Sequence, residues 1–171
     1  HAVGAGALGN TVAVAAMVEA PELDAGAVEG GGEALVAERM LGGAVGEVLA
    51  AHEQAGNGLF RGIRHAAGWD DSEVVRNSHS NPPEHLYAEP AFREGLAELG
   101  RRGMVFEAWH YHRQISELTD LARAFPDTTM ILNHFGGPIG IGPYAGQREE
   151  ILTQWRLDID ELAKCPNVVA K

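Results

Sequence analysis

Four of the eight histidines follow directly on apolar segments that are typical of strands in a parallel sheet. They are His65, His110, His112 and His134. Functional groups in parallel α/β proteins gather just past the carboxyl ends of the strands, so these imidazoles could converge. Converging imidazoles can bind a divalent metal or move protons. A histidine after a strand is more often a capping or packing residue, however, and that alternative applies to each of the four.

His134 is the strongest of these candidates. It follows the apolar segment 128–133 and precedes Gly136 and Gly137. Glycines at such a point let the backbone approach a ligand closely and expose the side chain before them. We therefore predict that His134 belongs to an active site, and that Asn133 beside it contacts the substrate.

The neighbouring strand ends carry further candidates. Arg64 could hold a substrate carboxylate in bidentate fashion, although a salt bridge within the sheet is an equally good reading. In an extended segment His110 and His112 would share one face and Tyr111 would point the opposite way, which leaves a two-histidine metal site and a packing role both open. Trp109 could stack on a substrate ring or belong to the core. The predicted substrate-binding residues are Arg64, His65, Trp109, Tyr111, His112 and Asn133.

Strands and helices alternate along the chain and must position these residues. The hydrophobic pattern predicts strands at 11–18, 59–64, 104–109, 128–133 and from 168 onward. Helical spacing predicts helices at 45–55, from Pro90, from a cap at Ser116, and over 151–162, whereas residues 19–43 show no clear pattern. Repeated alternation with buried strands implies a parallel sheet. An open doubly wound sheet and a partial (β/α)₈ barrel both fit, because a full barrel typically needs ~250 residues.

The composition excludes several classes of function. The net charge of −11 disfavours nucleic acid and anionic membranes as partners. No apolar run reaches the ~18–20 residues that cross a bilayer. Cys165 is the single cysteine, which suits a cytoplasmic protein. Phosphate-loop, dinucleotide and nucleophile-elbow motifs are absent from the sequence. The first residue is His1, and the last residues read as a strand, so both ends look cut.

Three segments, 60–65, 109–114 and 131–138, resemble the amidohydrolase-related family (amidohydrolase family 2) in their order and spacing. The closest likeness is to its lactonase-like branch. The likeness runs from about Ala44 to Lys171, so we expect residues 1–171 to form one incomplete barrel domain in which 1–43 is not matched.

The resemblance implies a (β/α)₈ barrel, here an α/β fragment, that hydrolyses a cyclic ester or amide by attack of water. His134 matches the family's mid-barrel histidine, which would polarise the carbonyl oxygen or hold a divalent metal such as Zn²⁺ or Mn²⁺. Arg64 matches a position that can bind a carboxylate of a small-molecule substrate. The family's first-strand His-x-His pair and last-strand Asp base cannot be placed in this sequence.

Two other functions, and the possibility of a homo-oligomer, stay open. A related barrel could decarboxylate or hydrate its substrate with the same histidines, or the chain could be a non-catalytic ligand-binding module. A homo-oligomer is compatible with the sequence. If the chain is a piece of a barrel, we expect it to be inactive alone and prone to aggregate through its open strand edges.

Overall fold

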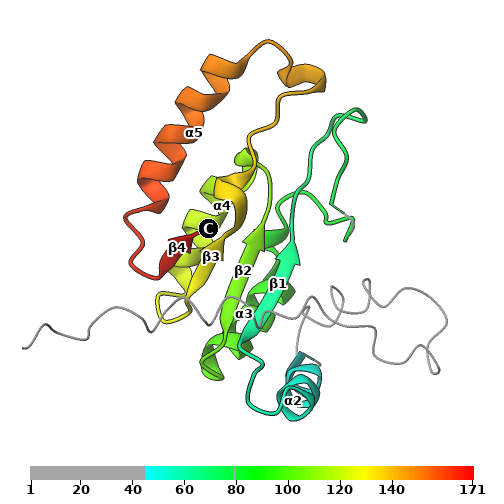
Figure 1. Cartoon of the computed structure of the whole chain (residues 1–171), viewed down its shortest axis with the longest axis vertical. Helices are drawn as coiled ribbons and strands as arrows, with labels where there is room; N and C mark the ends of the chain where they lie inside the picture. Colours follow the sequence, from blue (N-terminus) through cyan, green and yellow to red (C-terminus); the bar gives the residue numbers. More distant parts are fainter. Residues whose placement is uncertain (1–44, 79) are drawn as a thin grey trace, which may run out of the picture.

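The computed structural model describes residues 45–78 and 80–171 (Figure 1). The strand expected at 11–18 lies outside these residues. The helices are α2 (Val45–Ala55), α3 (Pro90–Arg101), α4 (Ile115–Ala124) and α5 (Arg148–Leu162). The strands are β1 (Gly62–Ala66), β2 (Val105–Trp109), β3 (Met130–Leu132) and β4 (Val168–Ala170). Strand and helix therefore alternate as the hydrophobic pattern predicts.

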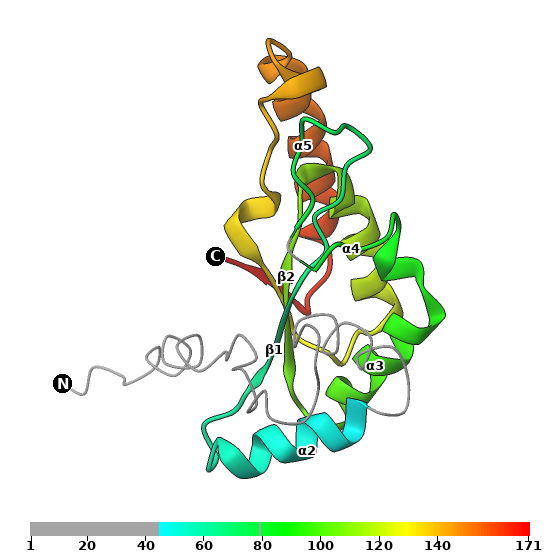
Figure 2. The same ribbon diagram turned by 90° about the vertical axis from the view of Figure 1, so that its right-hand side faces the viewer.

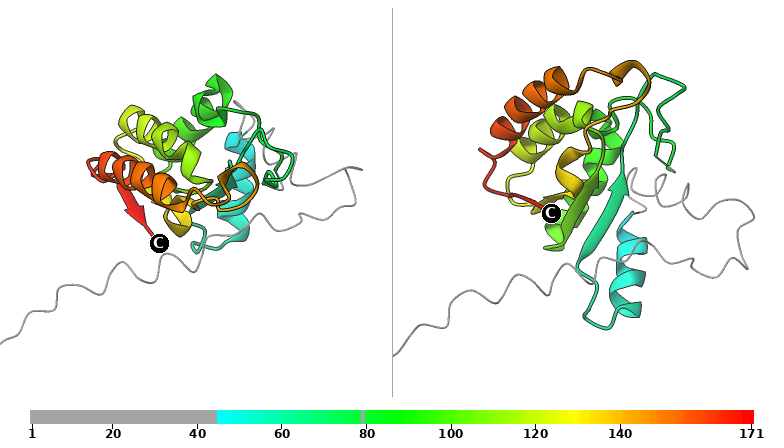
Figure 3. Two further views of the ribbon diagram at one scale, coloured as in Figure 1. Left: turned by 90° about the horizontal axis from the view of Figure 1, so that it is seen from above. Right: turned by 45° about the horizontal axis from the view of Figure 1, so that its top comes forward.

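The four strands form one parallel sheet in the order β1-β2-β3-β4. Each strand lies beside the next one along the chain. Helices α3 and α4, which connect the first three strands, lie on one side of the sheet, and α5 packs against α4 (Figures 2 and 3). Right-handed crossovers in sequential order place helices on one face, as in a (β/α)₈ barrel. A doubly wound sheet needs helices on both faces, so the described residues match part of a barrel.

The hydrophobic core fills the space between the sheet and these helices. Phe106, Met130 and Leu132 point toward it from the strands, and Leu96 and Leu118 meet them from α3 and α4. All five side chains are buried. Burial of one such side chain contributes about 1.5–3 kcal/mol, so this layer carries much of the stability.

Alternate strand residues point to the opposite face, which we call the inner face. Arg64 pairs in register with Glu107, Glu107 with Ile131, and Ile131 with Val169. Side chains in register on neighbouring strands share one face of a sheet. The strands therefore direct apolar side chains toward the helices and two charged ones toward the inner face.

Several boundaries differ from those expected. The first described strand is β1, Gly62–Ala66, rather than 59–64, so Arg64 and His65 lie inside the strand and not beyond it. Ser116 is not the cap of α4, because the helix begins at Ile115, after a short 3₁₀ turn. These shifts follow from pairing with β2 and from the preceding turn, neither of which local sequence reveals. Within the described residues, none of the helices combines the length and apolar character of a bilayer span.

Candidate active site

A charged cluster occupies the inner face of the sheet. Its centre is Glu107, whose side chain is fully buried in the middle of β2. Arg64 on β1 forms an ion pair with Glu107 Oε1, and Lys171 Nζ lies 2.6 Å from the same oxygen. Both cationic side chains are 30% exposed. We call Arg64, Glu107 and Lys171 the inner cluster.

The pKa of Glu107 is set by two opposing effects. Burial raises it, but the ammonium of Lys171 and the guanidinium of Arg64 outweigh burial and hold the pKa below its ordinary value. Glu107 is therefore a carboxylate at neutral pH. Asn133 is itself buried, and neither its Oδ1 nor its Nδ2 has a hydrogen-bond partner among the described residues. A buried acceptor of this kind is costly unless a ligand or water donates to it.

His134 follows Asn133 in a sharp turn at the carboxyl end of β3. Its φ is 51° and that of Phe135 is 53°, so two consecutive non-glycine residues are left-handed. Such residues cost of the order of 1–3 kcal/mol each and cluster at functional sites. Backbone bonds stabilise the turn: His134 N–H donates to Lys171 O (2.7 Å), and Trp155 Nε1 donates to Phe135 O (2.7 Å). The side chain of His134 is exposed.

Packing explains the first glycine after this turn. Gly136 has a φ of 74°, and a Cβ there would lie 2.7 Å from Ile115 Cδ1. Gly136 is therefore required by its own conformation and by contact with α4. The expectation that the glycines here let a ligand approach closely stays a prediction.

His110 and His112 lie in different surroundings. His110 is buried, and its Nδ1 donates to Tyr111 O (2.8 Å), while burial lowers its pKa to about 4. His112 begins a 3₁₀ turn, so the extended geometry that would place both on one face does not continue past Tyr111. Its Nδ1 accepts from Ile139 N–H (3.4 Å). Within residues 45–78 and 80–171, no group of three His, Cys, Asp or Glu side chains could hold a metal ion.

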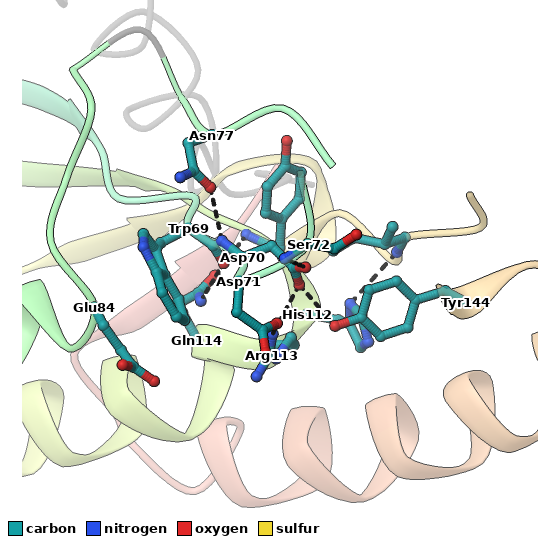
Figure 4. A network of polar contacts seen from close by, with 12 residues as sticks. Trp69, Asp70, Asp71, Ser72, Asn77, Glu84, His112, Arg113, Gln114 and Tyr144 are labelled. Atoms are coloured by element: carbon teal, nitrogen blue, oxygen red, sulfur yellow. Dashed lines mark hydrogen bonds and ion pairs between the residues drawn. The ribbon is translucent and has the colours of Figure 1, made fainter. Parts of the chain in front are cut away.

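A second network joins the loops that follow β1, β2 and β3 (Figure 4). Asp70 Oδ2 accepts hydrogen bonds from Arg113 Nη1 (2.8 Å) and Tyr144 OH (2.6 Å), and Asp70 Oδ1 accepts from Ser72 N–H (2.9 Å). The Asp70 side chain is fully buried. Burial raises its pKa, but the bonds from Tyr144, Arg113 and Ser72 outweigh burial and keep the pKa below its ordinary value. Asp70, Arg113 and Tyr144 are called the loop clamp below.

An open hollow of about 520 Å³ lies beside the loop clamp. Its lining residues are Asp71, Ser72, Arg113, Pro143, Tyr144 and Gln147. The hollow belongs to the same loops, at the carboxyl end of the sheet.

The structure brings together only some of the residues predicted to form a site. Arg64 and Asn133 meet around Glu107, and Lys171 O accepts from His134 N–H at the same end of the sheet. Trp109 and Tyr111 lie side by side, with ring centroids 5.5 Å apart. His65 does not join them: it is buried, and its ring lies 5.9 Å from that of Phe92, on the helix-facing side.

Five charged or polar residues were not predicted from the sequence: Glu107, Lys171, Asp70, Arg113 and Tyr144. Glu107 carried a signal, since a carboxylate in the apolar strand Val105–Trp109 needs a cationic partner. The other four carried none, because each acquires its role from a residue far away in sequence.

Comparisons with known proteins agree with this architecture. The family described as amidohydrolase matches residues 32–171. An uncharacterized protein, y4mH, of Sinorhizobium fredii is 36% identical over 128 residues, which are 74% of this chain and 39% of that protein. This chain therefore spans about two fifths of the length of that relative.

Solved structures show the same fold. An amidohydrolase from Burkholderia multivorans with bound HEPES matches at a TM-score of 0.54 and 24% identity, over 71% of this chain and 39% of its own. A second crystal form, with bound zinc, matches at 0.52 and 23%, over 74% and 40%. Since the family match covers most of the sequence, the chain belongs to the amidohydrolase family.

Proposed function

We propose that this chain supplies part of the active site of a hydrolase that opens a small carboxylated lactone, or a similar carbonyl compound, by attack of water. One observation carries the proposal. His134 lies in a strained turn at the carboxyl end of β3, next to Asn133 and the inner cluster. Strand carboxyl ends are where barrel enzymes keep their reacting groups.

In this proposal His134 acts on the substrate carbonyl. Its imidazole N–H would donate to the carbonyl oxygen and stabilise the negative charge that develops there as water attacks the carbon. The bond between the carbonyl carbon and the ring oxygen then breaks, and the proton that the attacking water gives up ends on the released alkoxide, so that an acid and an alcohol result. Asn133 offers a buried amide beside the reacting group. The family's aspartate base is not assigned to any described residue.

Substrate binding is assigned to the inner cluster. Arg64 and Lys171 both meet the carboxylate of Glu107, on a chain whose net charge is −11. Glu107 holds both cations at the inner face, and cationic side chains in such a place can bind a substrate carboxylate. The cluster therefore favours an anionic substituent over a neutral one.

The place of a metal is a separate question. A structural relative from Burkholderia multivorans was crystallised with bound zinc. His134 is the candidate ligand in this chain, but it belongs to no three-ligand group among the described residues. These residues alone do not fit a metal site, so each step above is assigned to the chain's own side chains.

Hydrolysis of a lactone panel by the natural protein that contains this sequence tests the proposal. We expect ring opening of carboxylated lactones, and a loss of about 10²–10³-fold in kcat/KM for His134→Asn, as removal of one donor to the developing oxyanion costs. His85→Asn is the matched control, because His85 is also left-handed (φ 59°), and asparagine tolerates that conformation. Release of CO₂ instead of ring opening, or equal loss in both variants, would contradict the proposal.

A further inference from the structure

The loop clamp connects three separate loops through one carboxylate. Asp70 belongs to the loop after β1, Arg113 to the turn after β2, and Tyr144 to the loop after β3. Arg113 and Tyr144 both donate to Asp70 Oδ2, at 2.8 and 2.6 Å. Figure 4 shows the two side chains approaching Asp70 from different elements. A single buried atom thus holds the two later loops to the first.

Other hydrogen bonds connect the same loops around Tyr111 and His112. Tyr111 OH donates to Arg76 O in the first loop. His112 N–H donates to Gly137 O (3.3 Å), and His112 Nδ1 accepts from Ile139 N–H (3.4 Å), both in the third loop. The ring of His112 also lies edge-on to that of Tyr144, with centroids 5.4 Å apart. Tyr111 is therefore held by the first loop and His112 by the third, and Asp70 joins these two loops.

Arg113 meets two carboxylates, and burial distinguishes Asp70 from Asp71. Arg113 Nη1 also meets Asp71 (2.9 Å), but the Asp71 side chain is 73% exposed. Exposed ion pairs contribute little, typically below about 1 kcal/mol, whereas a charge-assisted bond to a buried carboxylate is stronger. The connection among the loops therefore depends on Asp70 and not on Asp71.

We propose that the loop clamp is a positioning device for substrate binding: Asp70 and Tyr144 fix the loops that place Tyr111 and His112 at the mouth of the site. The proposal deepens the proposed function and rests on it for the role of Tyr111 and His112. Asp70 and Tyr144 act through those two residues, so their loss changes affinity for the substrate more than the chemical step.

Amide hydrogen exchange tests the clamp without reference to activity. In Tyr144→Phe we expect the amides of Ser72 and Ile139 to exchange about fivefold faster, while that of Phe106 in the sheet is unchanged. Tyr87→Phe is the matched control, because Tyr87 is buried and its hydroxyl has no hydrogen-bond partner among the described residues. Unchanged exchange of Ser72 and Ile139 in Tyr144→Phe would overturn the clamp.

Steady-state kinetics of the natural protein test whether the loop clamp affects substrate binding. For Tyr144→Phe and for Asp70→Asn, which keeps the shape of the side chain, we expect KM to rise at least fivefold with kcat within twofold of the parent. A fall in kcat at unchanged KM would overturn the positioning role. A parent protein that opens no lactone would refute the proposed function. The hydrogen-exchange measurement would still show whether Tyr144 and Asp70 hold the loops together.

Discussion

The inner cluster and the loop clamp each hold a buried carboxylate in place, but they do so by different means. Each is centred on a carboxylate whose side chain is fully buried, and in each two side chains donate to a single oxygen of it. Glu107 lies within a strand, so the register of the sheet fixes it beside Arg64. Asp70 lies in a loop and itself holds the loops in place. Strands thus position the inner cluster, whereas the loop clamp positions its own surroundings.

This difference predicts different consequences for loss of either carboxylate. Removal of Glu107 should destabilise the whole fold, because Arg64 and Lys171 would lose their shared carboxylate within the sheet. Removal of the bonds to Asp70 should open the loops and leave the sheet intact.

The largest expected effect is that of Glu107→Gln. Breaking a buried ion pair costs about 3–5 kcal/mol, and the partial exposure of both cations favours the lower end, about 3 kcal/mol. Urea unfolding of the natural protein measures the change. Glu161→Gln is the matched control, since Glu161 also meets two cations, Arg123 and Lys164, but its side chain is 51% exposed. A loss as small as that of the control would show that the inner cluster is not structural.

Acid should weaken the fold through His110. Its pKa in the folded chain is about 4, below its ordinary value of 6.5, so the unfolded chain binds the proton more readily. The contribution is complete above pH 6.5 and is lost as the pH falls toward 4. Each pKa unit corresponds to about 1.4 kcal/mol, so the free energy of unfolding should fall by about 2 kcal/mol between pH 6.5 and 5.

A pH series of unfolding curves tests this assignment. His110→Gln should flatten the dependence between pH 6.5 and 5, and His85→Asn should not, because His85 is exposed and its Glu117 contact raises the pKa of His85. Glu107 and Asp70 have lowered pKa values, so their contributions are lost at more acidic pH. An unaltered slope in His110→Gln would exclude His110 as the cause.

The smallest stability effect is expected for Tyr144→Phe. One hydroxyl bond to Asp70 is lost, which costs about 1 kcal/mol in a global unfolding measurement. Tyr87→Phe should be neutral, because the Tyr87 hydroxyl gives up no bond within the described residues. Equal effects of the two substitutions would mean that the bond from Tyr144 to Asp70 contributes nothing measurable.

The sequence predicted the parallel α/β class, the described helices and the position of His134 after a strand. These depend on hydrophobic period and on turn residues, which are local properties. Arg64 could be noticed at a strand, yet its partner Glu107 lies 43 residues away and is found only through the pairing of β1 with β2. The same limit hid Asp70, whose partner Tyr144 is 74 residues distant.

His65 is the reverse case, a residue predicted for the site that lies on the other face of the sheet. The sequence placed it just past a strand, where a site residue would lie, but β1 extends to Ala66 and directs His65 toward the helices. Because the strand continues past Arg64, His65 lies within it, and successive strand residues face opposite sides, so His65 lies on the face opposite to that of Arg64.

One ratio tests the division between the inner cluster and the loop clamp most directly. It is kcat/KM of the natural protein for a carboxylated lactone, divided by kcat/KM for its neutral methyl ester. We predict that Lys171→Gln lowers this ratio at least tenfold, whereas Tyr144→Phe lowers both terms alike and leaves the ratio unchanged. A ratio unaffected by Lys171→Gln, or lowered equally by both substitutions, would contradict the assignment of anion recognition to the inner cluster.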